Sequence, residues 1–188
     1  MRKYGLSRPD IMQEQDSSYE TIKEMIDGAR HKIVTNKNRG LKTLIIVHYG
    51  GHGVMKGNVT HAVVNDPVKP LYPIETMCRS LSKVAGGYVI ALLDCCRAKF
   101  DVEKFRGPQD RDIIIEEEVL LGAMAGSQNL IMIFGCEPNR RVNAESCLVQ
   151  DFLARVDEST LPNGSIILPG RLSNFRTSNG GEALCPVD

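Results

Sequence analysis

The sequence predicts an α/β protein with a mostly parallel sheet flanked by helices. Three short runs are almost wholly apolar and rich in β-branched residues, as is typical of strands buried on both faces of a parallel sheet: residues 44–47, 88–93 and 130–134. Segments with helical periodicity lie between and around these runs. Strands that alternate with helices indicate βαβ units, in which helices cover both faces of the sheet.

Three segments are predicted to be helices. Residues 18–34 place their apolar side chains on one face, and Ser17 and Glu20 have the spacing of a capping box. Residues 74–85 show a similar face and are followed by Gly86 as a stop signal. A third helix is predicted over residues 144–156.

Other segments lie outside this alternation. Residues 54–66 have the pattern of a small hairpin that turns at residues 56–58. Residues 97–112 are charged and aperiodic, which indicates a surface loop. Residues 113–125 fit a strand or a helix equally well, and residues 169–188 are rich in turn-forming residues.

Length and charge exclude several classes of protein. A chain of 188 residues corresponds to about one domain, at roughly 150 residues per domain. The 23 basic residues balance the 23 acidic ones, so no global charge attracts nucleic acid or an anionic membrane. The sequence shows no apolar leader and no run of membrane-spanning length. We therefore expect one cytoplasmic domain with reduced thiols, and neither nucleic-acid nor membrane partners.

The loops that follow the three predicted strands hold the candidate catalytic groups. Ligand sites of open parallel sheets lie beyond the carboxyl ends of the strands, which selects residues 48–53, 94–97 and 135–139. If the first two strands are neighbours, about 4.8 Å apart, His52 and Cys96 can face each other. A thiolate nucleophile, an imidazole that carries protons and backbone N–H donors for an oxyanion would then meet at this edge.

Each of these residues also has other interpretations. His52 alone fits a turn histidine, and Cys96 alone fits a buried structural thiol. A metal site formed by His48, His52, Cys95 and Cys96 is another option. However, Tyr-Gly-Gly between the two histidines forms helix poorly, and no Glu follows His48 as H-E-x-x-H requires. We therefore expect no metal at these residues.

The two motifs together resemble those of the caspase, metacaspase and paracaspase superfamily of cysteine peptidases. Residues 48–53, His-Tyr-Gly-Gly-His-Gly, are similar to the metacaspase H-Y-S-G-H-G, and residues 94–97 lie between the metacaspase D-S-C and the caspase A-C-R. Cys96 follows His52 by 44 positions, against a separation of about 50 in caspases. The resemblance covers residues 43–152. It implies a caspase-like three-layer sandwich, with the N-terminal strand-helix unit shortened in this chain.

The resemblance implies a role for each residue of the two motifs. His52 and Cys96 would form the catalytic dyad of a cysteine endopeptidase. The N–H groups of Gly53 and Cys96 would be the oxyanion donors. His48 would be structural at the strand end, and Cys95 would pack inward or shape the pocket.

The resemblance also suggests the specificity of the enzyme. Asp94 would lie at the floor of the primary pocket and select Arg or Lys, because a buried carboxylate favours a cationic partner. Glu137 would be a second carboxylate of this pocket. Two features of the sequence argue against a preference for Arg or Lys. Asp94 also fits a cap of the following turn, and residues 140–143 resemble the Arg-bearing substrate strand of true caspases.

The resemblance divides the single domain, residues 1–188, into three parts. Residues 1–96 correspond to the large subunit, residues 97–128 to a linker, and residues 129–188 to the small subunit and a tail. Such linkers are often cut by the enzyme itself, and this one carries four basic residues that are candidate cleavage points: Lys99, Lys104, Arg106 and Arg111.

Protein or peptide substrates are the expected partners. A homodimer through the edge of the small subunit is typical of caspases, whereas metacaspases usually remain monomeric, and the sequence leaves both open. No cofactor is expected. Calcium activation is compatible with the resemblance, although no dense carboxylate cluster nominates a site. The alternative function is a catalytically inactive caspase-like scaffold or regulatory module, which the shortened N-terminal unit favours.

Overall fold

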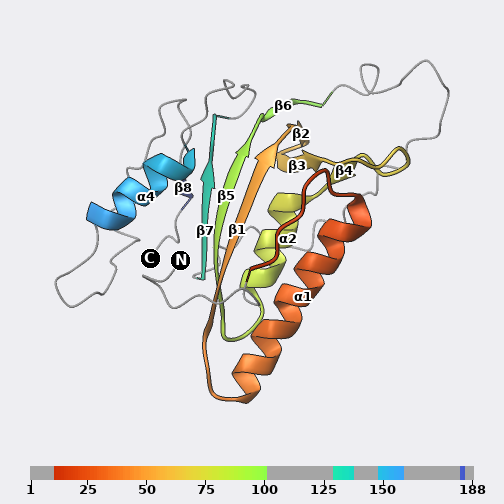
Figure 1. Cartoon of the computed structure of the whole chain (residues 1–188). Helices are drawn as coiled ribbons and strands as arrows, with labels where there is room; N and C mark the ends of the chain where they lie inside the picture. The colour runs from red at the N-terminus through yellow and green to blue at the C-terminus, as the bar shows by residue number, and fades with distance from the viewer. Residues whose placement is uncertain (1–10, 101–128, 138–147, 159–182, 185–188) are drawn as a thin grey trace.

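A mostly parallel four-stranded sheet forms the centre of the protein. The structure is a computed structural model that describes residues 11–100, 129–137, 148–158 and 183–184. The strand order is β1-β5-β7-β8 (Figure 1). The first three strands are parallel and β8 is antiparallel to β7: β1 (Thr43–Gly51), β5 (Gly87–Cys95), β7 (Leu130–Phe134) and β8 (Ala183–Leu184). The predicted α/β class with a mostly parallel sheet is confirmed.

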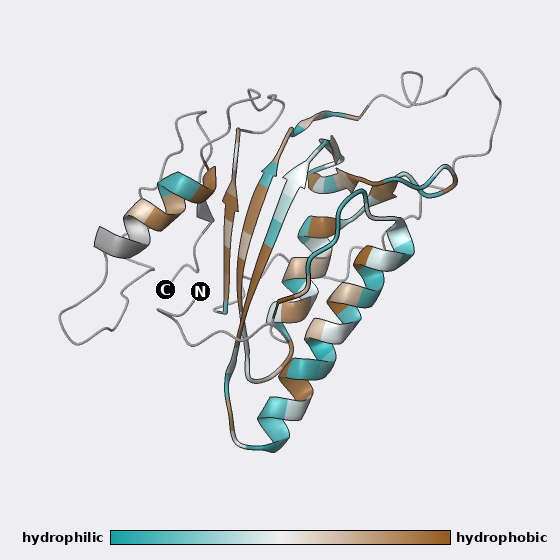
Figure 2. Ribbon diagram, viewed as in Figure 1, coloured by the Kyte–Doolittle hydropathy of each residue, from teal (hydrophilic) through white to brown (hydrophobic). Residues whose placement is uncertain are grey.

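Helices cover both faces of this sheet. The helices α1 (Tyr19–Asn38) and α2 (Ile74–Ser82) lie on one face, and α4 (Leu148–Glu158) lies on the other (Figure 1). Successive side chains of β5 point to opposite faces of the sheet. Its odd-numbered side chains pack with α1 and α2, while Ile90 and Leu92 pack with Leu148 and Phe152 of α4. Figure 2 shows the resulting concentration of hydrophobic residues in β5 and β7.

The helix ends differ from the predicted ones. Ser18, one residue after the predicted cap, accepts a hydrogen bond of 3.2 Å from the N–H of Thr21 and caps α1. The carbonyl of Ser17 instead accepts the N–H of Asn65. The second helix ends at Ser82, before the predicted end at residue 85, and a turn that includes Gly86 at φ 90° leads from it into β5. The beginning of the third predicted helix, residues 144–147, lies outside the described residues.

A second, smaller sheet lies next to the carboxyl ends of β1 and β5. Its order is β4-β3-β2-β6, formed by β4 (Leu71–Tyr72), β3 (Val59–Val63), β2 (Gly53–Lys56) and β6 (Ala98–Lys99). β2 and β3 form the predicted hairpin, with Gly57 at φ 59° in its turn. The prediction of a surface loop is wrong for residues 98–99, because they pair in parallel with β2.

β1 and β5 both extend beyond their predicted ends. The parallel ladder continues through Gly50 opposite Asp94 and Gly51 opposite Cys95. Thus His48 lies inside β1 rather than at the strand end, and Asp94 and Cys95 belong to β5. The apolar runs are interrupted by His48 in β1 and by Asp94 in β5, but the strands continue because backbone pairing does not depend on apolar side chains.

Several predictions concern residues that the structure does not describe. They are the assignment of residues 113–125, the basic residues at 104, 106 and 111, the segment 140–143, and the turn-rich segment except for residues 183–184. None of the helices in the described ranges is long and apolar enough to cross a membrane.

Candidate active site

The two sheets bring His52 and Cys96 opposite each other. In the large sheet, Gly51 of β1 pairs with Cys95 of β5. In the small sheet, Val54 of β2 pairs with Ala98 of β6. The two residues of each pair are 44 positions apart in the sequence. Residues 51–54 and 95–98 therefore remain in register as they pass from the large sheet into the small one. The backbone of His52 therefore lies across from that of Cys96, at a spacing typical of neighbouring strands, about 4.8 Å.

Gly53 allows this close approach. A Cβ atom at Gly53 would lie 2.5 Å from the carbonyl oxygen of Cys96 and 2.6 Å from Sγ of Cys95. Both distances are far shorter than van der Waals contact, so only glycine fits between the two chains without displacing them. Gly53, which follows the candidate histidine, is thus in direct contact with the backbone of Cys96, the candidate nucleophile.

We expect Gly53→Ala to lower the free energy of unfolding by about 1–3 kcal/mol, because the added methyl group overpacks a buried backbone contact. Urea unfolding measures this change. Gly28→Ala is the matched control. A Cβ at Gly28 in α1 would meet only Sδ of Met12, at 3.7 Å. That variant should therefore be stabilised by about 0.5–1 kcal/mol through its helix propensity. Equal stability of Gly53→Ala and wild type would contradict the packing described here.

The backbone of His52 is held by two donors. The hydroxyl of Tyr49 donates to the carbonyl of His52 at 2.8 Å, and the N–H of Val63 donates to the same oxygen at 2.8 Å. The Tyr49 hydroxyl also lies 3.0 Å from the carbonyl of Val63. Burial raises the pKa of Tyr49, and so does the neighbouring Cys95 thiol. The hydroxyl therefore keeps its proton and acts as a donor across the physiological pH range.

The direction of the Gly53 N–H follows from the pairing of β2 with β3. Since the Val63 N–H donates to the His52 carbonyl, the next pair, Gly53 and Ala62, is of the non-hydrogen-bonded type. The N–H of Gly53 therefore points away from β3. It is turned to the side on which β6 and Cys96 lie.

The two adjacent cysteines differ in environment. Cys95 is fully buried among the side chains packed between the sheet and α1 and α2, as predicted. Burial raises the pKa of its thiol to about 12, with a smaller contribution from Cys136. A thiol with such a pKa is almost entirely protonated at neutral pH and is a poor nucleophile. Cys96 is half-buried, so its side chain is the more accessible of the two.

Asp94 lies between two glycines. On β1 its partner is Gly50. On the other side the N–H of Gly135 donates to the carbonyl of Leu93 at 2.9 Å, which continues the β5–β7 pairing and puts Gly135 level with Asp94. The register partners of the half-buried Asp94 are therefore glycines on both sides, and the ring of His48 on β1 lies 3.5 Å from where a Cβ of Gly50 would be.

Glu137 lies at the same edge of the sheet. The thiol of Cys136, the preceding residue, lies 3.5 Å from the carbonyl oxygen of Cys95. This contact places Cys136 beside the end of β5, so Glu137, the next residue, follows at the same edge of the sheet. Its side chain is exposed, in contrast to the half-buried Asp94. The structure thus brings Asp94 and Glu137 to the strand ends that hold His52 and Cys96.

Arg97 is a buried cation that the sequence interpretation did not assign to the site. It is only 5% exposed, and its guanidinium lies over the ring of Phe134 at 3.8 Å. Its Nε donates to Oγ1 of Thr60 at 3.3 Å and its Nη1 to the carbonyl of Cys136 at 3.5 Å. These contacts join the residue after Cys96 to both β3 and the end of β7. A charged residue directly after a candidate nucleophile was the one signal for this role in the sequence.

Neither metal chemistry nor similarity to known proteins identifies the site. Within the parts of the chain that the structure describes, no three His, Cys, Asp or Glu side chains are grouped so as to hold a metal ion, and this includes the set with His48 and Cys95. His48 is exposed on β1. The sequence matches no model of a known protein family, and no curated protein is similar to it.

Proposed function

We propose that the protein is a caspase-like cysteine endopeptidase that cleaves after Arg or Lys, with His52 and Cys96 as its catalytic dyad. The observation that carries this proposal is the common separation of 44 residues in the pairs Gly51–Cys95 and Val54–Ala98. It brings an imidazole and an accessible thiol to the carboxyl ends of neighbouring parallel strands. Such edges are where α/β proteins hold their ligands.

Peptide hydrolysis needs a nucleophile, donors to an oxyanion and a group that carries protons, and these residues are suited to the three roles. The Cys96 thiol gives its proton to His52, and the thiolate attacks the carbonyl carbon of the scissile bond. The N–H groups of Cys96 and Gly53 are the proposed donors to the resulting oxyanion. His52 then protonates the leaving amine, which gives a thioester on Cys96. Water, deprotonated by His52, hydrolyses this thioester and regenerates the thiol.

The preference for Arg or Lys rests on Asp94. Asp94 is half-buried, its register partners Gly50 and Gly135 carry no side chains, and a long substrate side chain would approach it beside the exposed ring of His48. A carboxylate in such a place attracts a guanidinium or ammonium group and repels an Asp side chain. The exposed Glu137 supplies a second negative charge at the same edge.

Labelling of the thiol tests the proposed dyad. A chloromethyl ketone peptide that ends in Arg should alkylate Cys96 in the native protein, as peptide mapping by mass spectrometry measures. Cys95 and Cys78 should remain unmodified, because burial raises the pKa of each thiol to about 12. His52→Ala should slow the labelling of Cys96 about 100-fold or more, whereas the exposed His48→Ala should not.

The competing function is a catalytically inactive caspase-like scaffold. One observation favours it: β1 is the edge strand of the large sheet, so within the described residues no strand-helix unit lies beyond it. Labelling of Cys96 that is slow, and equal in wild type and His52→Ala, would support the scaffold and contradict the peptidase.

We also propose that the enzyme cuts its own linker, residues 97–128. Lys99 is the least suitable of the four candidate cleavage points, because it pairs with Met55 and the N–H of the next residue, Phe100, donates to the Met55 carbonyl at 2.7 Å. We therefore expect cleavage after Lys104, Arg106 or Arg111, detected by mass spectrometry after prolonged incubation with and without calcium. A protein that stays intact, or is cut equally in Cys96→Ala, would contradict self-processing.

A further inference from the structure

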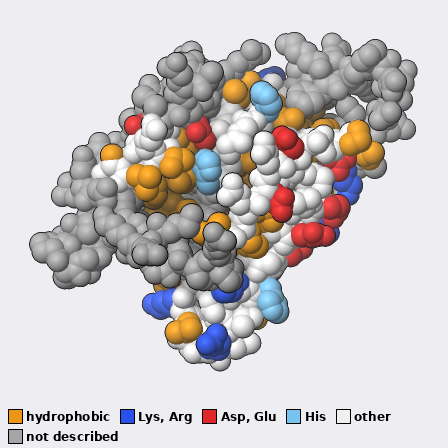
Figure 3. Space-filling view, in the orientation of Figure 1, with side chains coloured by type: hydrophobic (Ala, Val, Ile, Leu, Met, Phe, Trp, Pro, Cys, Tyr) orange, Lys and Arg blue, Asp and Glu red, His pale blue; other side chains and the backbone are white. Residues whose placement is uncertain are grey.

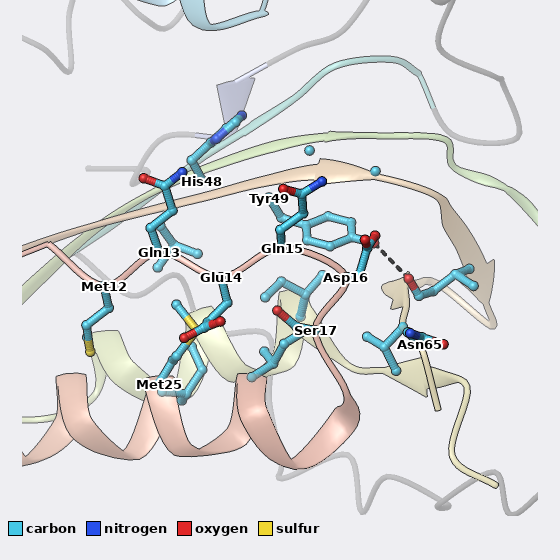
Figure 4. Close-up of a pocket in the computed structure, with 18 of the residues that line it drawn as sticks. Met12, Gln13, Glu14, Gln15, Asp16, Ser17, Met25, His48, Tyr49 and Asn65 are labelled. Atoms are coloured by element: carbon cyan, nitrogen blue, oxygen red, sulfur yellow. Dashed lines mark hydrogen bonds between the residues drawn. The ribbon is translucent and has the colours of Figure 1, made fainter. Parts of the chain in front are cut away.

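The outer edge of β1 lies open beside a groove. β1 is the terminal strand of the large sheet, and no strand of the described residues pairs with its free edge. The groove has a volume of about 1010 Å³, and residues 46–52 form one of its sides. Residues 11–17 form another side and run alongside β1 (Figure 4). An unpaired strand edge offers N–H and C=O groups to a further strand.

The position of residues 11–17 limits what can enter the groove. The carbonyl of Ser17 accepts the Asn65 N–H at 3.0 Å, which fixes one end of this segment. Near its other end, Met12 packs against Gly28 of α1. If residues 11–17 were paired directly with β1, the two segments would lie about 4.8 Å apart and would leave no space of this volume between them. The space between β1 and this segment therefore suits one extended chain.

The face of β1 next to the groove is apolar and uncovered. Leu44 is 56% exposed and Ile46 54%, and Tyr88, the partner of Leu44 on β5, is 38% exposed. α4 covers Ile90 and Leu92 on the same face but not these three side chains. Because side chains of paired residues point the same way, every second residue of a strand added to β1 would pack on Leu44 and Ile46.

Across the groove from β1, residues 13–17 carry polar and acidic side chains. Figure 4 shows Gln13, Gln15 and Asp16 turned towards β1, while Glu14 is turned towards α1. Neither Asp16 nor Glu14 has an ion-pair partner within the described residues, and none of the described side chains that line the groove is Lys or Arg. Acidic side chains also gather along α1 (Figure 3), but the residues of α1 that line the groove itself are apolar: Ile22, Met25 and Ile26. The remaining residues of an added strand would therefore meet the amides of Gln13 and Gln15 and the negative charge of Asp16.

We propose that this groove binds an extended peptide in which apolar and basic residues alternate, added as a strand to β1. The main chain would pair with the free edge, the apolar side chains would cover Leu44 and Ile46, and the basic ones would face Asp16. Asp94 and Cys96 do not line the groove. His52 of the proposed dyad does line it, so peptide binding is tested below in a variant in which neither cleavage nor recognition at Asp94 contributes.

A labelled octapeptide in which Val and Lys alternate is the probe for this test. Its binding is measured by fluorescence anisotropy to the full chain carrying Cys96→Ala and Asp94→Asn, so that neither cleavage nor recognition at Asp94 contributes. We expect saturable binding, and hydrogen exchange should slow at the amides of residues 44–51. The same peptide with N-methyl groups on alternate amides should bind at least tenfold more weakly, because it lacks the paired N–H donors.

One matched pair of variants tests the contribution of charge to peptide binding. Asp16→Asn should weaken binding of the Val-Lys peptide about two- to fivefold, since an exposed ion pair contributes little. Asparagine also tolerates the φ of 51° at this position. Asp27→Asn, on α1 and outside the groove, should leave binding unchanged.

Three results would overturn the proposal. They are equal affinity for the N-methylated peptide, protection of amides elsewhere in the chain, and protection of residues 44–51 by self-association without peptide. The last result would assign this edge to a second copy of the chain.

Discussion

Cys96→Ala is expected to abolish peptidase activity, with a fall in kcat/KM of at least about 1000-fold. The reason is that alanine has no group that can attack the carbonyl carbon, while the backbone that faces His52 stays in place. Hydrolysis of a fluorogenic peptide that ends in Arg measures the loss. Urea unfolding should be nearly unchanged, because Cys96 is half-buried and its thiol is small.

Cys95→Ala is the matched control for this prediction. Its side chain is fully buried against Gly53 and lies among the residues packed with α1 and α2. We expect this variant to lose about 1–2 kcal/mol of stability through a small cavity, and to keep kcat/KM within about tenfold of wild type. Equal loss of activity in both variants, or activity in Cys96→Ala, would contradict the assignment of the nucleophile.

Asp94→Asn is expected to reduce kcat/KM for substrates with Arg or Lys before the scissile bond by at least about 30-fold, corresponding to about 2 kcal/mol. The amide keeps the shape of the carboxylate but removes the charge that the cationic side chain would meet between Gly50 and Gly135. Activity on a substrate with a neutral residue at that position should change much less. The ratio of the two kcat/KM values is therefore the measured quantity.

Two further variants locate this effect. Glu137→Gln should lower kcat/KM only a few-fold, because the side chain of Glu137 is exposed and its charge is screened. Asp27→Asn, on α1, removes a carboxylate of the same kind from the opposite face of the sheet and should have no effect. If Asp94→Asn left the preference for Arg intact, Asp94 would only cap the turn that follows β5.

The fold class was predictable because its signals are local. The runs 44–47, 88–93 and 130–134 are β-branched and apolar, and all three lie in parallel strands. Their ends were not predictable, because Gly50, Gly51 and Asp94 pair through their backbones alone. The strand at residues 98–99 was not predictable either, because its charged surroundings give no signal for a strand and it forms only by pairing with β2.

The candidate site was only partly predictable. The two motifs made His52 and Cys96 candidates, but the register that puts them opposite each other became visible only when the strands were paired. Supporting contacts such as that of Tyr49 with the His52 carbonyl depend on the hairpin that follows, which sequence spacing does not fix. The burial of Arg97 over Phe134 joins residues 37 positions apart in the chain, and no local pattern indicates it.

The central claim is tested most directly by a panel of fluorogenic peptides that differ only in the residue before the scissile bond. Arg, Lys and Asp peptides are compared on the wild-type protein and on Cys96→Ala. We predict that wild type cleaves the Arg and Lys peptides and that Cys96→Ala cleaves none. Cleavage of the Asp peptide alone would contradict the role of Asp94, and equal cleavage by both proteins would contradict the dyad of His52 and Cys96.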